Sequence, residues 1–359
     1  MKRFLKILVF PLLALNVAGA VCLIGCAYSP ILPTEHMPLL LLAGLAFPFA
    51  LAVNVLFLIF WGLIYPRYMA VSLITGLICL AQIRAFIPVN FDRQSPPENS
   101  LKVLSYNILS PNINASNANK DNAIISYLEK ADADIICLQE FHFSALKKHS
   151  NLLKKYPYKS YQVSKASESA SGYLGCLSKY PILDVENYRF NATYNGANRY
   201  RILHGKDTIV VYNCHLQSNG LQGKDKSVYE QILSNPKENI RSNGTKELVK
   251  KLRDSAVKRA SQADIIVADL EKQTSPYIIV CGDFNDSPIS YACYKMKEQL
   301  DDAYASSGNG PGISYNRNKM YYRIDHILHS PHFKAYKCTV DRSIKASDHY
   351  PIYCFLKKE

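Results

Sequence analysis

The sequence has 359 residues, enough for one large domain with additional segments. Its formal net charge is +13, and the part after residue 90 holds 37 basic and 28 acidic side chains, a net charge of +9. This balance suits an anionic partner, either nucleic acid or anionic lipid, although a merely solvated basic surface has the same composition. The ten cysteines include no CxxC pair, which argues against a cysteine metal site and a disulfide framework.

Three long apolar runs dominate the first ninety residues, at about 5–26, 37–64 and 68–87. A hydrocarbon core of about 30 Å is crossed by about 20 helical residues, so each run is long enough to span a membrane. Only three residues separate the second and third runs, which predicts a helical hairpin. We expect residues 1–90 to be a transmembrane region of about three helices, with Trp61, Tyr65 and Tyr68 as interfacial aromatic residues.

Basic residues predict the orientation of these helices. Lys2, Arg3 and Lys6 precede the first run, whereas the loop after it has no Lys or Arg, and Arg67 lies in the second loop. Short basic loops stay in the cytoplasm, so three crossings place the rest of the chain on the outer side. We expect an integral protein of a bacterial-type inner membrane, with its C-terminal part on the periplasmic side.

The first apolar run has two further interpretations. It is compatible with a cleaved signal peptide. Its segment Leu23-Ile24-Gly25-Cys26 also resembles a bacterial lipoprotein cleavage site, with Cys26 as the lipidated residue. Two further spanning runs would make a lipid anchor redundant, and cleavage there would still leave the C-terminal part outside. The uncleaved anchor is therefore favoured.

A polar, Pro-rich stretch at 91–100 predicts a linker before a soluble unit at 101–359. Apolar runs in this unit predict strands at 101–106, 134–139, 173–178, 208–214, 277–281, 323–328 and 351–356. Helical spacing of apolar residues predicts helices at 121–130 and 245–272, and the polar stretch 225–243 is interpreted as a loop or insertion. Many strands with few, separated helices favour sheets packed on each other with helices outside.

Polar residues recur where the predicted strands begin or end. They are Tyr106-Asn107, Gln139-Glu140, Asn213-Cys214-His215, Gly282-Asp283-Phe284-Asn285, Arg323-Ile324-Asp325-His326 and Ser347-Asp348-His349. Each is weak evidence alone: a lone Asn is usually a turn residue, and a lone His in a strand is usually structural. Asp325 has the further simple explanation of pairing with Arg323.

Taken in this order, the motifs resemble the endonuclease/exonuclease/phosphatase superfamily, and the resemblance extends from Leu101 to about Leu356. Tyr173 and the segment Leu177-Ser178-Lys179-Tyr180-Pro181-Ile182 belong to the same resemblance. Several ordered matches are far more specific than any one motif. The resemblance implies an α/β (α+β) fold, a four-layer sandwich of two packed mixed β-sheets flanked by helices, with residues 101–359 as the catalytic domain.

The resemblance also implies a metal site. Glu140 would offer a hard oxygen ligand for Mg²⁺ (or Mn²⁺), with Asn107 beside it and Asp348 on the far side. The metal would neutralise the phosphate and orient the reacting groups. Some nuclease relatives carry an acid two residues after the first-strand Asn, where this chain has Leu109. One metal is therefore the default expectation.

Five further residues are implied as catalytic: His215, Asp283, Asn285, Asp325 and His349. His349 would be the general base or the group that balances charge on the phosphate, with its tautomer fixed by Asp325. Asp283 would orient the attacking water or bind a second metal. Asn285 would donate its amide to a phosphate oxygen, and His215 would do the same or assist the leaving group.

Two functions remain open from sequence. The first is a membrane-anchored, metal-dependent phosphoesterase that acts on an anionic phosphoester, either DNA or RNA or a phospholipid headgroup, with no obligate protein partner. Tyr315, Tyr321 and Tyr322 near the predicted rim suit either substrate. The second is a non-catalytic membrane-tethered binding protein that retains the fold; the full set of catalytic residue types argues against it. Arg259 and Gln262 on the long predicted helix are either site residues, as in relatives, or a solvated face.

Overall fold

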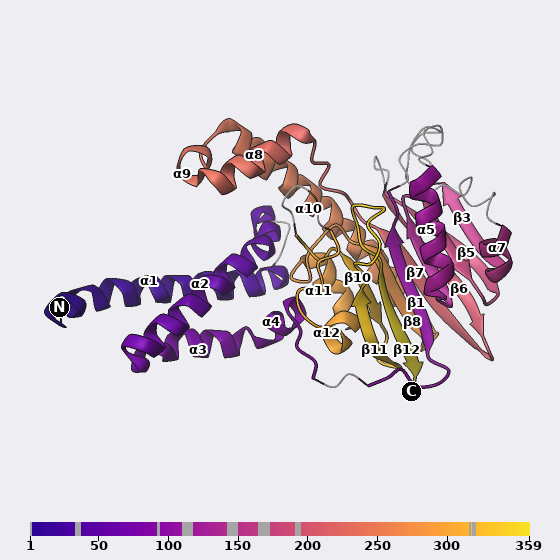
Figure 1. Ribbon diagram of the computed structural model, residues 1–359, viewed down its shortest axis with the longest axis horizontal. Helices are drawn as coiled ribbons and strands as arrows, with labels where there is room; N and C mark the ends of the chain where they lie inside the picture. The colour runs from indigo at the N-terminus through magenta and orange to yellow at the C-terminus, as the bar shows by residue number, and fades with distance from the viewer. Residues whose placement is uncertain are drawn as a thin grey trace.

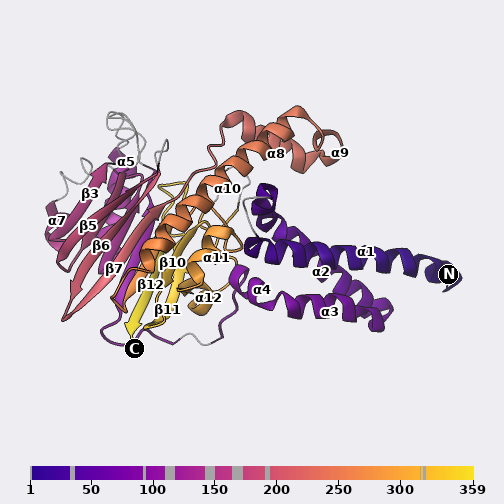
Figure 2. The same ribbon diagram turned by 180° about the vertical axis from the view of Figure 1, so that it is seen from behind.

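The computed structural model describes residues 2–32, 37–91, 94–109, 118–141, 150–163, 173–190, 195–315, 317 and 321–359. A bundle of apolar helices stands on one side of a block of two sheets, and both views show the N-terminus at its far end (Figures 1 and 2). Two parts of the chain named above, residues 33–36 of the first loop and residues 92–93 of the linker, lie outside the described residues.

Two mixed sheets, each of six strands among the described residues, form the block. The first sheet has the spatial order β11 (Phe333–Val340), β12 (Ile352–Lys358), β1 (Leu101–Asn107), β2 (Ile135–Gln139), β4 (Tyr173–Ser178), β3 (Tyr158–Val163). The second has the order β5 (Ile182–Arg189), β6 (Gly196–His204), β7 (Asp207–His215), β8 (Ile278–Asp283), β10 (Asp325–His329), β9 (Asp301–Asp302). The pairs β1–β2 and β7–β8 are parallel, and the other pairs are antiparallel.

Helices cover the outer faces of both sheets, so the predicted four-layer sandwich is confirmed. The helices of this part are α5 (Ala118–Ala131), α7 (Ser150–Lys155), α8 (Gly223–Ser234), α9 (Pro236–Asn239), α10 (Asn243–Leu270), α11 (Tyr291–Lys297) and α12 (Ala303–Ser307). One core of side chains such as Val211 and Ile279 fills the space between the sheets. A second core packs α10 and α11 on β7 and β8, and a third packs α5 and α7 on β1 and β2. The central strands read as continuous apolar runs because both of their faces are covered.

The interpretation of residues 225–243 as a loop is wrong, because α8 and α9 occupy most of this stretch. A capping box begins α8: Gln222 accepts from the third helical residue, and the Asp225 side chain accepts from the Gln222 backbone. The side chain of Val228 faces α10, where a Cβ added to Gly244 would lie 3.0 Å from it. A cap and an apolar contact thus stabilise a helix that is otherwise polar.

The apolar N-terminal part is α1 (Lys2–Tyr28), α2 (Ala43–Ile64), α3 (Met69–Ile78) and α4 (Leu80–Phe86), with short 3₁₀ turns η1 (Ser29–Ile31), η2 (Pro38–Leu42) and η3 (Pro66–Tyr68). By length and composition, Val9–Ile31 and Pro38–Ile64 are able to cross a membrane. Pro66–Ile78 and Leu80–Phe86 make a third span only if the pair, bent by 66°, is counted as one. The chain therefore has two or three candidate spans within its described residues.

A polar cluster ties the three apolar segments together. Asn16 of α1 donates from Nδ2 to Ser72 Oγ of α3 at 3.0 Å, and its Oδ1 accepts from Trp61 Nε1 of α2, also at 3.0 Å. Hydrogen bonds of this kind join helices in an environment without water. The expectation of Trp61 as an interfacial residue is wrong: its side chain is fully buried, whereas Tyr65 and Tyr68 are half-buried at the hairpin end.

The helices pack directly on the sheet block. Gly44 of α2 lies so close to the segment after β8 that an added Cβ would sit 1.8 Å from the Ile289 carbonyl oxygen. Arg323 donates to the Ala85 carbonyl at the end of α4, and its guanidinium lies 4.3 Å from the Tyr304 ring centroid. Asn90 beyond α4 donates to the carbonyls of Ala305 and Gly308. The apolar N-terminal helices therefore contact the sheet block at three points, near Ile289, Arg323 and Ala305.

Candidate active site

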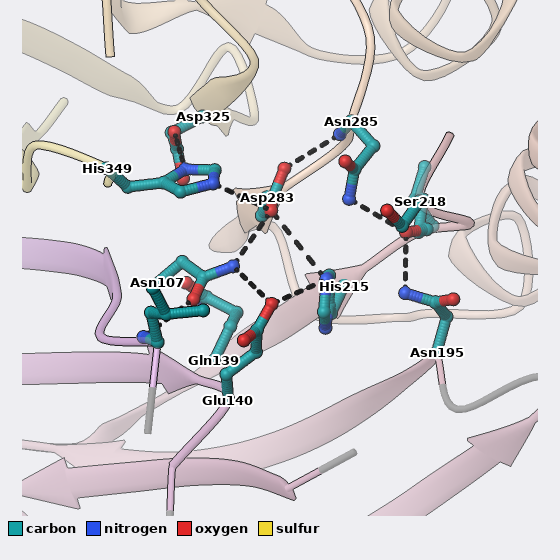
Figure 3. A network of polar contacts seen from close by, with 12 residues as sticks. Asn107, Gln139, Glu140, Asn195, His215, Ser218, Asp283, Asn285, Asp325 and His349 are labelled. Carbon is teal, nitrogen blue, oxygen red and sulfur yellow. Dashed lines mark hydrogen bonds and ion pairs between the residues drawn. The ribbon is translucent and has the colours of Figure 1, made fainter. Parts of the chain in front are cut away.

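The two parallel strand pairs bring four polar side chains to one edge of the molecule. Asn107 ends β1 and Glu140 follows β2 in the first sheet, while His215 ends β7 and Asp283 ends β8 in the second. The carboxyl ends of neighbouring parallel strands meet at the same edge, and the packing of the sheets joins the two edges. Figure 3 shows these side chains pointing toward one another.

Asn107 connects the two carboxylates. Its Nδ2 donates to Glu140 Oε1 at 3.2 Å and to Asp283 Oδ2 at 3.0 Å. His215 faces the same two groups, with Nε2 at 3.8 Å from Glu140 Oε1 and 3.7 Å from Asp283 Oδ2. Asp283 is buried and Glu140 is half-buried. One amide and one imidazole therefore hold carboxylates from both sheets together.

His349 and Asp325 form a buried pair beside this group. The Nδ1 atom of His349 lies 2.8 Å from Asp325 Oδ2, and its Nε2 lies 3.6 Å from Asp283 Oδ2. Burial lowers the pKa of His349, but the carboxylates of Asp325 and Asp283 outweigh that effect and raise the pKa to about 10. The ring is thus oriented between two carboxylates, with Nδ1 on Asp325 and Nε2 toward Asp283.

Asp325 does not pair with Arg323, the simple alternative that its sequence neighbour offered. The Arg323 side chain turns toward Ala85, Tyr304 and Asp302, whose Oδ2 lies 3.9 Å from Nη2. Asp325 is fully buried, its backbone N–H donates to Ser314 Oγ, and its Oδ1 has no hydrogen-bond partner among the described residues. Among the described residues, His349 is therefore the hydrogen-bond partner of the Asp325 carboxylate.

Asp348 and Asn285 complete the set implied by the resemblance. Asp348 is half-buried and accepts from Ser347 Oγ at 3.3 Å. The Asn285 backbone donates to Asp283 Oδ1 at 2.8 Å, and its side-chain Nδ2 donates to the Leu216 carbonyl at 3.1 Å. Asn285 and Glu140 have positive φ angles of 52° and 51°. Strained backbone of this kind is typical of functional sites, and here it sets the direction of both side chains.

A cavity of about 620 Å³ opens on this cluster. Glu140, His215, Asp283, Asn285, Asp348 and His349 line it. Asn107 and Asp325 lie behind the lining, where they hold Glu140 and His349. Two of the three rim tyrosines, Tyr315 and Tyr322, line the same cavity, whereas Tyr321 lines a separate pocket with Arg317 and Arg342. Six of the eight predicted side chains thus face one open space, and the other two support them.

The side chains fit a hard divalent cation. Four carboxylates converge here, from Glu140, Asp283, Asp325 and Asp348, while Lys226 is the one Lys or Arg among the described residues that line the cavity. Carboxylate and amide oxygens are the ligands that Mg²⁺ and Mn²⁺ prefer. Atoms of Asp283, Asp325 and His349 lie within 4.8 Å of one another. Within this group, Asp325 and His349 also bond to each other at 2.8 Å.

Arg259 and Gln262 of α10 are buried, so their interpretation as a solvated face is wrong. Arg259 donates from Nε to Asp286 Oδ2 and from Nη1 to the Gln217 carbonyl, both at 2.9 Å. The Gln262 Oε1 atom accepts from the Gln217 backbone at 2.7 Å. The two residues hold the segments that follow β7 and β8, and with them His215 and Asp283. Asp286 is the acid that pairs with Arg259 in this arrangement.

A second supporting bridge, between Gln139 and Asn213, lies under the site and was not predicted. Gln139 of β2 donates from Nε2 to Asn213 Oδ1 of β7 at 2.6 Å. Asn213 donates to the Leu138 and Gly175 carbonyls of the other sheet, both at 3.0 Å. Both residues belong to the sequence motifs named above, but only the packing shows that they link the two sheets. A polar residue inside an apolar strand is the one feature of the sequence that could have indicated this link.

Comparison with known proteins places this geometry in a family. The pattern of the Endonuclease/Exonuclease/phosphatase family matches residues 104–349, and that of a domain of unknown function matches residues 5–86. The search of curated proteins finds no match.

Solved structures give the same fold. D. rerio TDP2 complexed with single-strand DNA product has a TM-score of 0.53 and 17% identity, over 73% of this chain and 100% of that one. The human Nocturnin catalytic domain with bound sulfate has a TM-score of 0.53 and 17% identity, over 74% and 97%. Sphingomyelinase C from Streptomyces griseocarneus has a TM-score of 0.50 and 19% identity, over 71% and 99%. At these identities the likeness concerns the fold.

Proposed function

This chain belongs to the Endonuclease/Exonuclease/phosphatase family, and we propose that it is a membrane-anchored, divalent-metal-dependent hydrolase of phosphoesters. The observation that carries this proposal is the meeting of Glu140, His215, Asp283 and His349 at one cavity. A non-catalytic binding protein would have no need for a carboxylate as deeply buried as Asp325 behind an oriented histidine. The enzyme is therefore favoured over the tethered binding protein.

We assign the metal to Glu140, with Asn107 beside it and Asp348 across the cavity. A bound Mg²⁺ or Mn²⁺ would supply Lewis-acid stabilisation of charge on the phosphate. In the reaction, a water oxygen bonds to phosphorus, one phosphorus–oxygen ester bond breaks, and the leaving oxygen keeps the electron pair and takes up a proton. Asp283 lies between Asn107, which is beside the proposed metal ligand Glu140, and His349. It is therefore well placed to orient the attacking water.

The remaining roles follow from the donors that face the cavity. Asp325 holds His349 so that Nε2 points to the cluster, where it acts on the water or balances charge on the phosphate. Asn285 uses one amide hydrogen for Leu216, and its second remains for a phosphate oxygen. His215 lies across from His349, on the far side of Asp283 (Figure 3), and suits the leaving group or another phosphate oxygen.

Glu140→Gln is expected to abolish the response to metal in the full-length protein. Mg²⁺ or Mn²⁺ should raise the melting temperature of the wild type, because a ligand that binds only the folded state stabilises it. The variant should lose the metal-induced increase in melting temperature and most of its hydrolysis of bis-p-nitrophenyl phosphate. EDTA should abolish hydrolysis by the wild type. Glu247→Gln, an exposed acid on α10, is the matched control. Turnover in EDTA, or an unchanged thermal shift in Glu140→Gln, would refute the assignment.

We also propose the division into a transmembrane region at 1–90, a linker at 91–100 and a catalytic domain at 101–359, with the catalytic domain on the periplasmic side. The N-terminus and the Tyr65–Tyr68 turn lie at the end of the helices away from the sheets, which suits an odd number of crossings (Figure 1). A reporter that is active only in the periplasm, fused after Glu359, should be active. Activity of a cytoplasmic reporter at that position would overturn this orientation.

A further inference from the structure

We infer that the substrate is a membrane lipid with a phosphoester headgroup, whose hydrocarbon chain lies against a wall formed by α2, α8 and α10 while the headgroup reaches the catalytic cluster. This inference rests on the proposed hydrolase function of the same site and names its substrate class. Three separate features of the structure support it: the lining of the cavity, the surface of α2, and the charge of the segment around α8.

The catalytic cavity has an apolar wall as well as a polar one. Leu45 and Phe49 of α2, Ile232 of α8, and Leu248 and Leu252 of α10 line the same space as Glu140 and His349. A volume of about 620 Å³ falls in the range of ligand pockets, which is about 300–1,000 Å³. Hydrolysis of a small phosphate ester needs no such wall. An amphipathic substrate uses both surfaces at once.

The apolar wall continues into the surface of a candidate membrane span. Phe49 is 58% exposed, and Val53, Leu56 and Leu63 further along α2 are 42%, 66% and 82% exposed. Their spacing of three, four and seven residues puts them on one side of the helix. Pro38–Ile64, which contains all of them, is apolar enough to cross a membrane. A hydrocarbon chain therefore has a continuous apolar path along α2 from the bilayer to the cavity.

The segment that closes the cavity opposite α2 has the character of a membrane-surface element. Residues 223–258, from α8 to the first half of α10, hold nine Lys or Arg and five acidic residues. Ile240 at the turn before α10 is 59% exposed. Figures 1 and 2 show α8 and α9 projecting from the sheets on the side where α1 and α2 lie. Basic segments with exposed apolar residues bind anionic lipid surfaces.

Nucleic acid fits this cavity less well. Grooves for single-stranded nucleic acid follow the phosphate backbone with cationic side chains. Among the described residues of the lining, Lys226 is the one Lys or Arg, and the helices α2, α8 and α10 contribute mainly aliphatic side chains. A basic pocket with Arg317, Arg342 and Lys345 exists, but it is separate from the catalytic cavity. A nucleic-acid substrate is kept as one outcome of the test.

The first experiment compares chain lengths with the unaltered full-length protein in a phosphate-free amphipol and Mg²⁺. The substrates are phosphatidylglycerols and phosphatidylcholines with acyl chains of two to six carbons, below their micelle concentrations, beside bis-p-nitrophenyl phosphate and a single-stranded oligonucleotide. Each methylene buried should raise kcat/KM by up to about fourfold, from about 0.8 kcal/mol per methylene. A flat dependence on chain length, or faster cleavage of the oligonucleotide than of every lipid, would overturn the lipid inference.

The reference substrate separates the two proposals. If bis-p-nitrophenyl phosphate is hydrolysed but kcat/KM does not rise with acyl-chain length, the hydrolase proposal is supported and the lipid inference is refuted. No Mg²⁺-dependent turnover of any substrate by the folded protein would sink both.

The second experiment alters the wall away from the membrane helices. Leu252→Asn combined with Ile232→Asn should lower the ratio of six-carbon lipid to bis-p-nitrophenyl phosphate turnover at least tenfold, and flatten the chain-length dependence. Ile265→Asn is the matched control, an exposed aliphatic residue of α10 outside the lining, and should leave the ratio as in the wild type. An equal ratio in the double variant and the control would contradict the inference.

A third measurement does not depend on turnover. Glu140→Gln protein in vesicles that contain phosphatidylglycerol with a photoreactive group at the end of one acyl chain should, after irradiation, carry the label in 38–64 and 223–252. Label confined to α1 and α3 would show that the chain does not enter the cavity.

Discussion

Replacing His349 with alanine is expected to lower kcat for bis-p-nitrophenyl phosphate about 10²–10⁴-fold, the usual contribution of a positioned acid or base. His349 lies between Asp325 and Asp283, at 2.8 and 3.6 Å, and lines the cavity, so another side chain is poorly placed to replace it. The measurement is kcat of the full-length protein with saturating Mg²⁺. A variant that keeps kcat within threefold of the wild type would remove His349 from the mechanism.

The stability of this variant has to be controlled, because the substitution leaves Asp325 fully buried without its partner. An unpaired buried charge costs about 3–5 kcal/mol. The double variant His349→Ala with Asp325→Asn removes both charges and should recover much of the melting temperature while kcat stays low. His332→Ala, an exposed histidine in the turn between β10 and β11, is the matched control and should behave as the wild type. Recovery of kcat together with stability would show a structural role alone.

Much of the site could be predicted because it depends on local order along the chain. Each motif ends or begins a strand, and strand ends are visible in a sequence as the point where an apolar run stops. The pairs β1–β2 and β7–β8 then place Asn107, Glu140, His215 and Asp283 at the same edge. The sequence could also identify Asp325 and His349, but their direct contact depends on how β10 and the segment before β12 meet.

The missing parts of the prediction depend on packing between distant segments. The side chains of strand β5 do not alternate between buried and exposed positions: half of its residues are exposed and half are partly buried. Its sequence therefore shows no period of two that would distinguish it from a loop. The sequence leaves Arg259 open between a site residue and a solvated face, because the helix period does not reveal that Asp286 packs against it. Trp61 was predicted to be interfacial because its hydrogen-bond partner, Asn16, lies 45 residues earlier in the chain. The local sequence around Trp61 gives no sign of this contact. The apolar wall of the cavity comes from three helices, and no single stretch of sequence contains it.

Gly282→Ala is expected to be the most damaging single substitution in the catalytic block. Gly282 has a φ of 139°, and a Cβ added there would lie 1.9 Å from the Cys214 carbonyl oxygen in the neighbouring parallel strand. Neither strand can retreat, because β7 and β8 are covered on both faces. We expect a loss of more than about 4 kcal/mol, the range reserved for severe core defects. For a domain of this size that corresponds to a melting temperature lower by at least about 8 °C.

Gly205→Ala separates this steric clash from the cost of a left-handed backbone. Gly205 also has a positive φ, 68°, but a Cβ added there would meet no atom within 4 Å. The control should therefore lose only the conformational preference, about 1–2 kcal/mol. Equal melting temperatures for the two variants would show that β8 has room at this point. A larger loss for Gly282→Ala, with catalysis lost in whatever folded protein remains, would show that close strand packing holds Asp283 beside His215, because both residues follow the clashing pair in register.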